Sequence, residues 1–210
     1  MRALKFGPST VDLPYTLRLY GVTERKFDSL TDEDTKAELI DGVMIVHSPA
    51  SPRHDNIAGL VRFLMRGYTG AKRLGLVLGP DSLIRLRKLR KVAPDGLFIR
   101  QKRVPRPLPE KQFELVPDLV FEVLSPSNRD VNLEIKWPAY RQAGVPEIWL
   151  IDPDNEEVVV DYRGKEGSTE TRTHEGRVAS TVLQGFWLDA AWLGADPLPN
   201  EMDCLQAILK

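Results

Sequence analysis

Glu122 stands in the middle of the most apolar segment of the chain, VPDLVFEVL at residues 116–124. Because this segment is apolar on both faces, we predict a central β-strand with layers packed above and below it. A carboxylate buried there costs several kcal/mol unless it is paired or binds a cation. The sequence therefore leaves two roles open for Glu122: a structural ion pair, or a metal ligand or acid–base group at a sheet edge.

Two other carboxylates could join Glu122. Asp95 belongs to a separate predicted strand, and neighbouring strands lie only about 4.8 Å apart, so the two side chains can lie side by side. Glu38 ends the first apolar run of a predicted hairpin and could supply a third carboxylate. Asp118 shares the face of Glu122, but four residues of strand span about 13 Å, so we expect it to cap the strand entry instead.

Carboxylates grouped in this way suit a hard divalent cation such as Mg²⁺ or Mn²⁺, which binds oxygen ligands and keeps several waters. The three histidines of the chain are too dispersed for a zinc site. Lys136 lies one turn before Tyr140 on the helix predicted after the Glu122 strand, beside its buried stripe. A lysine next to such carboxylates would favour metal-assisted phosphodiester hydrolysis, in which it stabilises the charge that develops on phosphorus oxygens. The alternative without a functional role is that Lys136 faces solvent.

Positive charge is concentrated in residues 85–111, although the 29 basic and 30 acidic residues of the chain give a net charge of only −1. That near-neutral balance argues against coating of nucleic acid by bulk attraction. A local positive field on a neutral protein suits an anionic ligand. A solvated hairpin with basic residues on its outer face would give the same pattern, so the segment alone does not decide between the two.

The length of 210 residues and the ordinary globular composition predict one domain with a sizeable core. No apolar run approaches the roughly 20 residues that cross a bilayer, and the first twenty residues carry no signal-peptide pattern. Cys204 is the single cysteine, so we expect no internal disulfide, no cysteine-based metal site and a reducing, cytoplasmic setting.

Hydrophobic periodicity predicts an α/β fold in which helices flank a mixed β-sheet. Asp41-Gly42 marks a hairpin over 37–46, and Ser51-Pro52 caps an amphipathic helix of about 52–68. A helix is predicted at 130–143, where Pro138 is awkward because it removes a backbone donor. The remaining predictions are an irregular leader at 1–30, a cap at 31–34, strands at 75–86, 92–100, 147–151 and 156–162, an exposed loop at 102–112 and packing helices in 185–210.

Five segments in this order resemble the putative restriction endonuclease family, once a domain of unknown function, within the PD-(D/E)XK nuclease superfamily. They are ELIDGVMIVHSPASPRH (38–54), GPDSLIRL (79–86), VAPDGLFI (92–99), VPDLVFEVLSPSNRD (116–130) and K-x3-Y-x3-GVPEIWLIDP (136–153). The resemblance covers about residues 37–165 and implies a restriction-endonuclease-like core. We therefore expect a leader at 1–36, the core at 37–165 and an extension of the same domain at 166–210.

The resemblance also implies a Mg²⁺- or Mn²⁺-dependent DNA endonuclease. By position, Asp95 and Glu122 are its expected metal ligands, and Glu38 and Lys136 complete the catalytic set. The lysine of the standard motif would stand at Leu124, so the motif implies that Lys136 replaces it from the following helix. His54 stands where the family often has a histidine, with packing or hydrogen bonding as its expected role. The expected DNA contacts are Arg85, Arg87, Lys88 and Arg90.

Two alternatives remain open at this point: a catalytically silent nuclease-fold module that binds DNA or another partner, which Leu124 favours, and a structural protein whose acidic strand residues are ion-paired. Because nucleases that cut both DNA strands often act as symmetric dimers, we also expect a homodimer, formed through residues 156–163 as an edge strand.

Overall fold

Strand β10 (Leu119–Val123) lies inside a six-stranded sheet, as its apolar sequence predicts. This computed structural model describes residues 4–6, 9–11, 15–32 and 35–210. The sheet order is β13-β12-β11-β10-β9-β6, and only β10 and β11 run parallel among its pairs. The other strands are β6 (Gly75–Leu78), β9 (Gly96–Arg100), β11 (Glu147–Asp152), β12 (Glu157–Gly164) and β13 (Gly167–Thr173).

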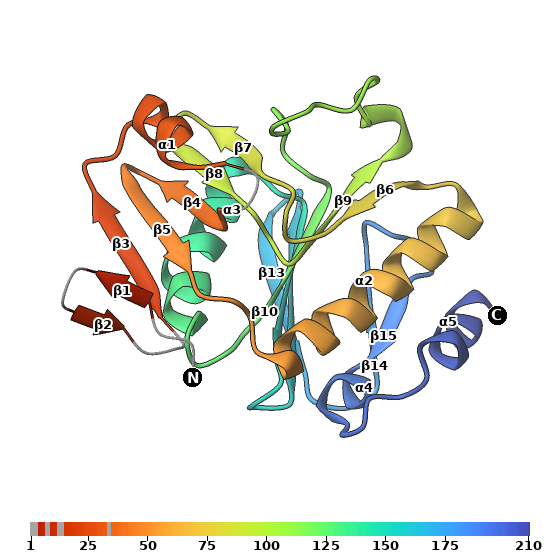
Figure 1. Cartoon of the computed structure of the whole chain (residues 1–210). Coiled ribbons are helices and arrows are strands. Elements are labelled where there is room, and N and C mark those ends of the chain that lie inside the picture. The colour runs from red at the N-terminus through yellow and green to blue at the C-terminus, as the bar shows by residue number, and fades with distance from the viewer. Residues whose placement is uncertain (1–3, 7–8, 12–14, 33–34) are drawn as a thin grey trace.

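Alternation along β10 separates its side chains into two cores. Phe121 and Val123 pack with helix α2 (Pro52–Lys72) and the C-terminal segment on one face. Val120 packs with Tyr140 and the helix after β10 on the other face. Because side chains two apart share a face, Glu122 points to the same side as Val120. Figure 1 shows α2 and α3 on opposite sides of this sheet.

A second, five-stranded sheet covers part of the Glu122 face. Its order is β3-β5-β4-β8-β7, made of Thr16–Tyr20, Val43–His47, Ala37–Ile40, Arg90–Val92 and Ile84–Arg87. Asp41 and Gly42 both have positive φ, at 49° and 85°, which is the turn geometry that a two-residue hairpin requires. The predicted hairpin is therefore confirmed, and it fixes the register that positions Glu38.

The single strand predicted at 92–100 is wrong in one respect, because it is divided between the two sheets. β8 ends at Val92 in the five-stranded sheet, and β9 begins at Gly96 in the six-stranded sheet. Pro94 lies in the crossing segment, where the absence of its backbone N–H interrupts no strand ladder. The crossing leaves Asp95 at the junction of the two sheets, directly before β9.

Helix α2 begins as predicted, with the Ser51 side chain accepting the backbone N–H of His54 and Pro52 in the first turn. It continues to Lys72, four residues beyond the predicted end. The helix predicted at 130–143 is divided into a π-helix, η2 (Val131–Lys136), and helix α3 (Trp137–Ala143). Pro138 has no N–H to donate to an α-helical ladder, and the preceding turn is the wider π form.

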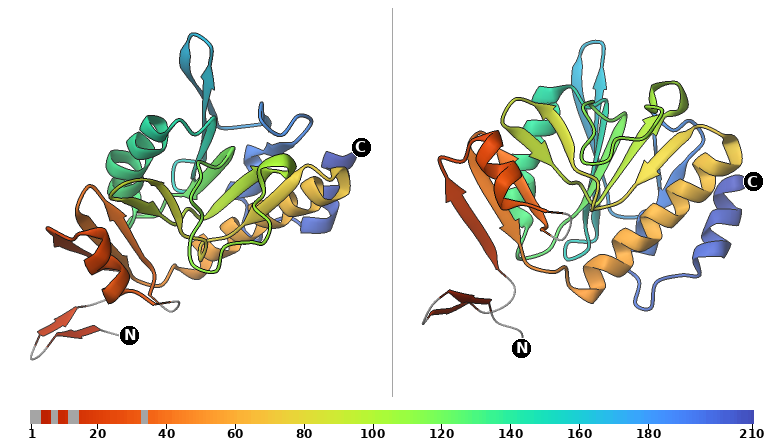
Figure 2. Two further views of the ribbon diagram at one scale, coloured as in Figure 1. Left: turned by 90° about the horizontal axis from the view of Figure 1, so that it is seen from above. Right: turned by 45° about the horizontal axis from the view of Figure 1, so that its top comes forward.

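Residues 156–162 are a strand but not an edge strand, which corrects the expected dimer contact. β12 pairs along its length with β13, and the two form a hairpin that projects from the body of the molecule (Figure 2, left). A second copy therefore cannot pair with β12 while β13 is in place. The expected contact through residues 156–163 is therefore wrong, and the homodimer itself stays a prediction.

The segments outside the expected core contain more structure than predicted. The leader is not irregular throughout: it contains β1 (Leu4–Phe6), β2 (Ser9–Val11), β3 and helix α1 (Glu24–Leu30). Thr23 caps α1 and Thr31 ends it, whereas residues 33–34 of the predicted cap lie outside the described residues. The C-terminal segment forms β14 (Arg177–Ala179), β15 (Trp187–Asp189), α4 (Ala190–Gly194) and α5 (Glu201–Leu209).

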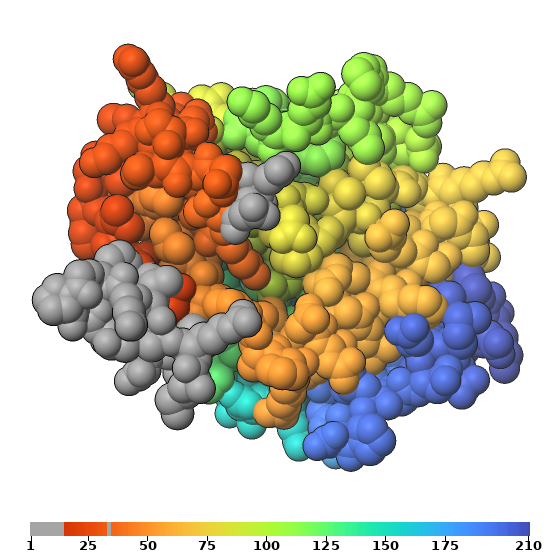
Figure 3. All heavy atoms as spheres, in the orientation of Figure 1, coloured from red at the N-terminus to blue at the C-terminus, as the bar shows by residue number. Residues whose placement is uncertain are grey.

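The exposed loop predicted at 102–112 is largely confirmed, after a short 3-10 helix, η1 (Gln101–Arg103). In Figure 3 this green segment lies along the top of the face shown, and the C-terminal segment, in blue, lies beside α2. None of the helices in the described part of the chain is long and apolar enough to span a membrane. The fold class is the predicted one: mixed α/β, with mixed sheets flanked by helices.

Candidate active site

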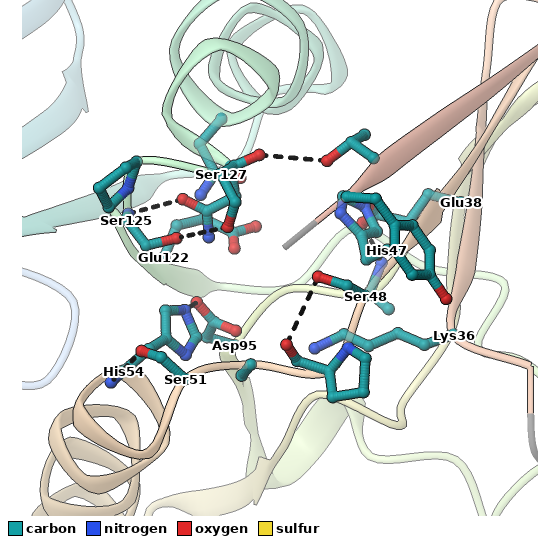
Figure 4. Close-up of a pocket in the computed structure, with 18 of the residues that line it drawn as sticks. Lys36, Glu38, His47, Ser48, Ser51, His54, Asp95, Glu122, Ser125 and Ser127 are labelled. Atoms are coloured by element: carbon teal, nitrogen blue, oxygen red, sulfur yellow. Dashed lines mark hydrogen bonds and ion pairs between the residues drawn. The ribbon is translucent and has the colours of Figure 1, made fainter. Parts of the chain in front are cut away.

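Asp95 and Glu122 come together because β9 and β10 are antiparallel neighbours. Phe121 pairs with Gly96, so the next position along each strand brings Glu122 level with Asp95. Oδ2 of Asp95 accepts the backbone N–H of Val123 at 2.8 Å. The predicted lateral approach of these two carboxylates is what the structure contains, and Figure 4 shows both at the same cavity.

Glu122 is 2 % exposed and has two partners from the helix after β10. The ammonium of Lys136 lies 2.6 Å from Oε1, and the Tyr140 hydroxyl donates to the same oxygen at 2.6 Å. Lys136 therefore reaches the carboxylates from the helix, as the spacing of its buried stripe predicts. No guanidinium is among these partners. Glu122 is nevertheless ion-paired with Lys136, which is part of what the structural alternative for Glu122 predicts.

Glu38 joins the site from β4 of the other sheet. Its Oε1 lies 3.0 Å from Nζ of Lys136 and accepts the backbone N–H of Ala93 at 2.7 Å. Its Oε2 lies 2.9 Å from Nε2 of His47 on β5. Lys136 also donates to the carbonyl of Ala93 at 3.3 Å. One ammonium thus links carboxylates from two sheets, and it lies where a cation between them would lie.

Burial and charge give the two glutamates opposite pKa shifts. Burial raises the pKa of Glu122 to about 7, because the charges of Asp95 and Glu38 add to the effect and Lys136 only partly offsets it. Burial also acts on Glu38, but the charge of Lys136 and the hydrogen bond of His47 hold its pKa at about 2. The carboxylates also raise the pKa of Lys136, despite its burial. Burial therefore favours the neutral form of Glu122, whereas the partners of Glu38 favour its charged form.

His54 lies at the cavity end of α2 and contacts Asp95. Its Nε2 is 3.1 Å from Oδ2 of Asp95 and 3.0 Å from the carbonyl of Val123. Because both neighbours are acceptors, Nε2 carries the proton. Burial alone would lower the pKa of His54, but the hydrogen bond and charge of Asp95 raise it overall. This is the hydrogen-bonding role that the sequence predicts.

All of these side chains except Tyr140 line one cavity of about 390 Å³ between the two sheets and the start of α2. Polar residues make up much of the rest of its wall, as Figure 4 shows. They include Lys36, Ser51, Ser125, Ser127, Asn128 and Asn132. The arrangement can bind an anionic group beside a set of carboxylates.

His47 and Tyr140 also belong to the network around Glu38 and Glu122, and neither is predicted as a site residue from the sequence. Tyr140 was recognised only as part of the buried helical stripe, although it lies one turn after Lys136. His47 was set aside with the dispersed histidines. In the hairpin register Glu38 pairs with Ile45, so His47 is its diagonal neighbour on the same face. The Asp41-Gly42 turn sets this register, so it is the sequence signal that would have placed His47 beside Glu38.

The four predicted DNA contacts lie outside the cavity wall, and the structure does not leave all of them free. Arg90 is buried, and Nε and Nη2 bind the carboxylate of Asp41, so its expected role in contacting DNA is corrected. Arg85 binds Glu24 and Glu114, and Arg87 lies 3.4 Å from Asp41. Lys88, in the β7–β8 turn, is exposed. Three of these four basic side chains thus form ion pairs, which hold the β7–β8 hairpin to its neighbours.

Asp118 lies outside the cavity, as the strand distance predicts. Its Oδ2 accepts the backbone N–H of Arg100 at 2.9 Å, and Oδ1 lies 2.8 Å from Arg103. It holds the start of β10 to the end of β9. Its role is structural.

Asp95 and Glu122 are the side chains of this site that fit a hard divalent cation. Both are buried carboxylates at the same cavity, and the hydrogen bonds and ion pairs described above use Oδ2 of Asp95 and Oε1 of Glu122. Among the described residues, no three His, Cys, Asp or Glu side chains form a ready-made metal cluster. Two carboxylates with retained waters are the mode of binding typical of Mg²⁺, so the donor chemistry fits that ion.

Comparison with known proteins gives a family and a fold. The family model described as "Uma2: Putative restriction endonuclease" matches residues 25–191. A solved structure, described as a putative nuclease belonging to DUF820 from Anabaena variabilis ATCC 29413, is similar with a TM-score of 0.69 and 22 % sequence identity. The similarity covers 82 % of this chain and 97 % of that chain. No curated protein matches at a significant level.

Proposed function

Because this chain belongs to the Uma2 family of putative restriction endonucleases, we propose that it is a divalent-metal-dependent endonuclease that hydrolyses DNA phosphodiester bonds. One observation carries the proposal. Buried carboxylates from two neighbouring strands, Asp95 and Glu122, line the same cavity as a buried lysine. That combination would bring ligands for a cation and a positive charge for a phosphate to one point.

Asp95 and Glu122 would hold Mg²⁺ or Mn²⁺ in this proposal. When bound, such an ion polarises a phosphoryl oxygen and lowers the pKa of bound water. Val123 and His54 orient the Asp95 carboxylate through the contacts to Oδ2. Tyr140 orients Glu122 in the same way. The protein would therefore hold both ligands in place before any substrate arrives, which would limit the reorganisation needed during reaction.

Lys136 would stabilise negative charge that develops on the phosphate oxygens. Its ammonium stays charged in the cavity because Glu122 and Glu38 raise its pKa. Glu38 positions it and is itself fixed by His47 and the N–H of Ala93. In the family motif this role belongs to a lysine at the position of Leu124. The arrangement supports Lys136 as its replacement.

A second candidate function is a catalytically silent nuclease-fold protein that binds DNA or another partner. The observation that favours it is the double ion pair of Lys136 with Glu38 and Glu122, which satisfies these groups without any metal. The two functions differ in what Mg²⁺ does. In the enzyme the ion binds and supports cleavage, whereas in the silent protein DNA binding is retained without measurable metal binding.

A nuclease assay on supercoiled, linear and single-stranded DNA, with Mg²⁺, Mn²⁺ or EDTA, tests the proposal. We expect cleavage with either metal, none with EDTA, and none by Glu122→Gln. Glu134→Gln is the matched control, because Glu134 is exposed on η2 between residues that line the cavity. Circular dichroism confirms that each variant is folded. Cleavage by Glu122→Gln at the wild-type rate would refute the catalytic role of this site.

A further inference from the structure

Asn132 has a buried amide group that the folded chain does not satisfy. The residue is 2 % exposed, it lines the cavity, and its Nδ2 has no hydrogen-bond partner among the described residues. A buried donor without an acceptor costs about 1–3 kcal/mol. Such groups are rare in folded proteins and call for a specific explanation, such as a ligand that supplies the missing acceptor.

The backbone holds Asn132 at this place. Its N–H donates to the carbonyl of Asn128 at 2.9 Å, and its own carbonyl accepts the N–H of Trp137, five residues later. That second bond is the π-helical one, and it directly precedes Pro138. Residues four apart lie on one face of a helix, so the turn presents Asn132 on the same side as Lys136. Single π-turns of this kind are frequent at functional sites.

Two other buried polar atoms in the described part of the chain also have no partner, and neither makes the same demand. Nη1 of Arg90 belongs to a side chain that is already bound to Asp41, away from the cavity. Nδ1 of His54 is the second ring nitrogen, and it is a donor only when the imidazole is protonated, so it is not an obligate donor. The amide nitrogen of Asn132, like the guanidinium nitrogen of Arg90, is always a donor, but of these two residues only Asn132 lines the cavity. Asn132 therefore requires an acceptor from outside the chain.

The cavity indicates which kind of acceptor fits. Lys36, Lys136 and the hydroxyls of Ser125 and Ser127 line the same cavity as Asn132. Beside the carboxylates, the cavity therefore also contains donors and positive charge. Hydrogen bonds to a charged oxygen are roughly twice as strong as those between neutral groups. We propose that Asn132 is a substrate-binding residue whose amide donates to a non-bridging oxygen of the DNA phosphate. This inference rests on the proposed function and names how the same site holds its substrate.

Asn132→Leu tests the inference, because leucine has a similar size and removes the unsatisfied donor. We expect the variant to unfold at a urea concentration no lower than the wild type. We also expect kcat/KM for duplex DNA with Mg²⁺ to fall about tenfold or more, as for the loss of one hydrogen bond to a charged oxygen. Unchanged cleavage by Asn132→Leu would overturn the inference.

Asn128→Leu is the matched control, since Asn128 lines the same cavity but has a satisfied amide. Its Nδ2 donates to Val123, and its Oδ1 accepts the N–H of Ser125. We expect this variant to lose stability, in contrast to Asn132→Leu. A stability loss in Asn132→Leu as large as in Asn128→Leu would show that Asn132 is bonded within the fold and would overturn the inference.

A second measurement keeps the inference testable if the wild-type protein cleaves no DNA, which would refute the proposed function alone. Inorganic phosphate is added to the metal-free protein, and the unfolding temperature is measured. We expect phosphate to raise this temperature for the wild type and for Glu134→Gln, and to raise it less for Asn132→Leu. An equal shift in all three proteins, or no shift in any of them, would overturn the inference.

Discussion

At the scale of single residues, the notable feature is a buried carboxyl group whose pKa is raised toward neutral pH. Glu122 is enclosed by the fold and shares its surroundings with Asp95 and Glu38, so its charged form is disfavoured even beside Lys136. A cation bound by Glu122 would favour the charged form instead. In the proposed enzyme, metal binding at Glu122 would therefore be linked to proton release.

The first prediction concerns the stability of the metal-free protein. The pKa of Glu122 is about 7 in the folded state, above its unfolded value of about 4.5. The folded state therefore binds more protons between these values, and the free energy of unfolding should decline as pH rises from about 4.5 to about 7. In Glu122→Gln this contribution is absent, so the decline should be smaller by up to about 3 kcal/mol.

Urea unfolding at about pH 5 and about pH 8 measures this difference. His54 also has a raised pKa, which contributes stability at low pH that is lost as pH rises, and the charge of Glu122 is a minor cause of that shift. The difference between the two proteins therefore reports Glu122 together with a smaller contribution of the same sign from His54. Parallel pH profiles for the wild type and Glu122→Gln would contradict the raised pKa.

The second prediction concerns Lys136, which compensates two buried carboxylates. Lys136→Met retains most of the apolar stem and removes the charge, so at about pH 8 we expect a loss of about 3–5 kcal/mol in unfolding free energy. The loss should be smaller at about pH 5, where Glu122 is protonated and one charge is already removed.

The double variant Lys136→Met/Glu122→Gln checks the physical reason. If the loss comes from an uncompensated charge on Glu122, adding Glu122→Gln should recover part of the stability at about pH 8. Additive losses from the two substitutions would instead show that the pair does not interact. Urea unfolding of the four proteins forms the complete cycle.

At the scale of elements, β11 is held to the C-terminal segment by another buried carboxylate. Glu147 is fully buried and accepts hydrogen bonds from the indole of Trp149, the hydroxyl of Ser180 and the backbone N–H groups of Thr181 and Val182. Glu147 shares the face of Trp149, on the side of the sheet away from Glu122. It joins two segments and takes no part in the cavity.

The third prediction is that Glu147→Gln separates stability from site chemistry. The amide places a donor where the fold supplies only donors, so we expect a loss of at least about 2–3 kcal/mol in unfolding free energy. Below the unfolding temperature, Mg²⁺ affinity should match the wild type. Glu166→Gln, at an exposed turn position, is the control. If Glu147→Gln lost no more stability than Glu166→Gln, the anchoring role of Glu147 would be contradicted.

Local signals in the sequence predict individual elements well. Asp41-Gly42 requires positive φ and gives the hairpin, and Ser51-Pro52 gives the start of α2. The apolar run around Glu122 gives the central strand. These predictions hold because each depends on local backbone geometry or on a side-chain period.

Features that depend on distant contacts were missed. Nothing local to 92–100 shows that the chain passes from one sheet to the other at Ala93–Asp95. Nor does 156–162 show that β13 will cover it, because the polar β13 sequence carries no apolar alternation. In the site, Glu38, Glu122 and Lys136 were recognised from their own segments. The amide of Asn132 was not, since an unsatisfied donor is defined only by the absence of neighbours in the folded chain.

At the scale of the whole molecule, the described chain presents a single cavity with this set of groups, and β12 offers no edge to a second copy. If this site is the proposed nuclease centre, it would hydrolyse one phosphodiester bond at a time. The fourth prediction is therefore that cleavage of supercoiled plasmid proceeds by separate cuts. Nicked circles should accumulate first, and linear DNA should appear after a lag.

Gel analysis of a time course with Mg²⁺ measures the order of the products. The rate of nicking should rise in proportion to protein concentration, because a single chain completes each cut. Linear DNA that appears without a nicked intermediate, with a rate that rises as the square of protein concentration, would show that two chains act together. In that case another surface than β12 must join them, since β13 already occupies its free side.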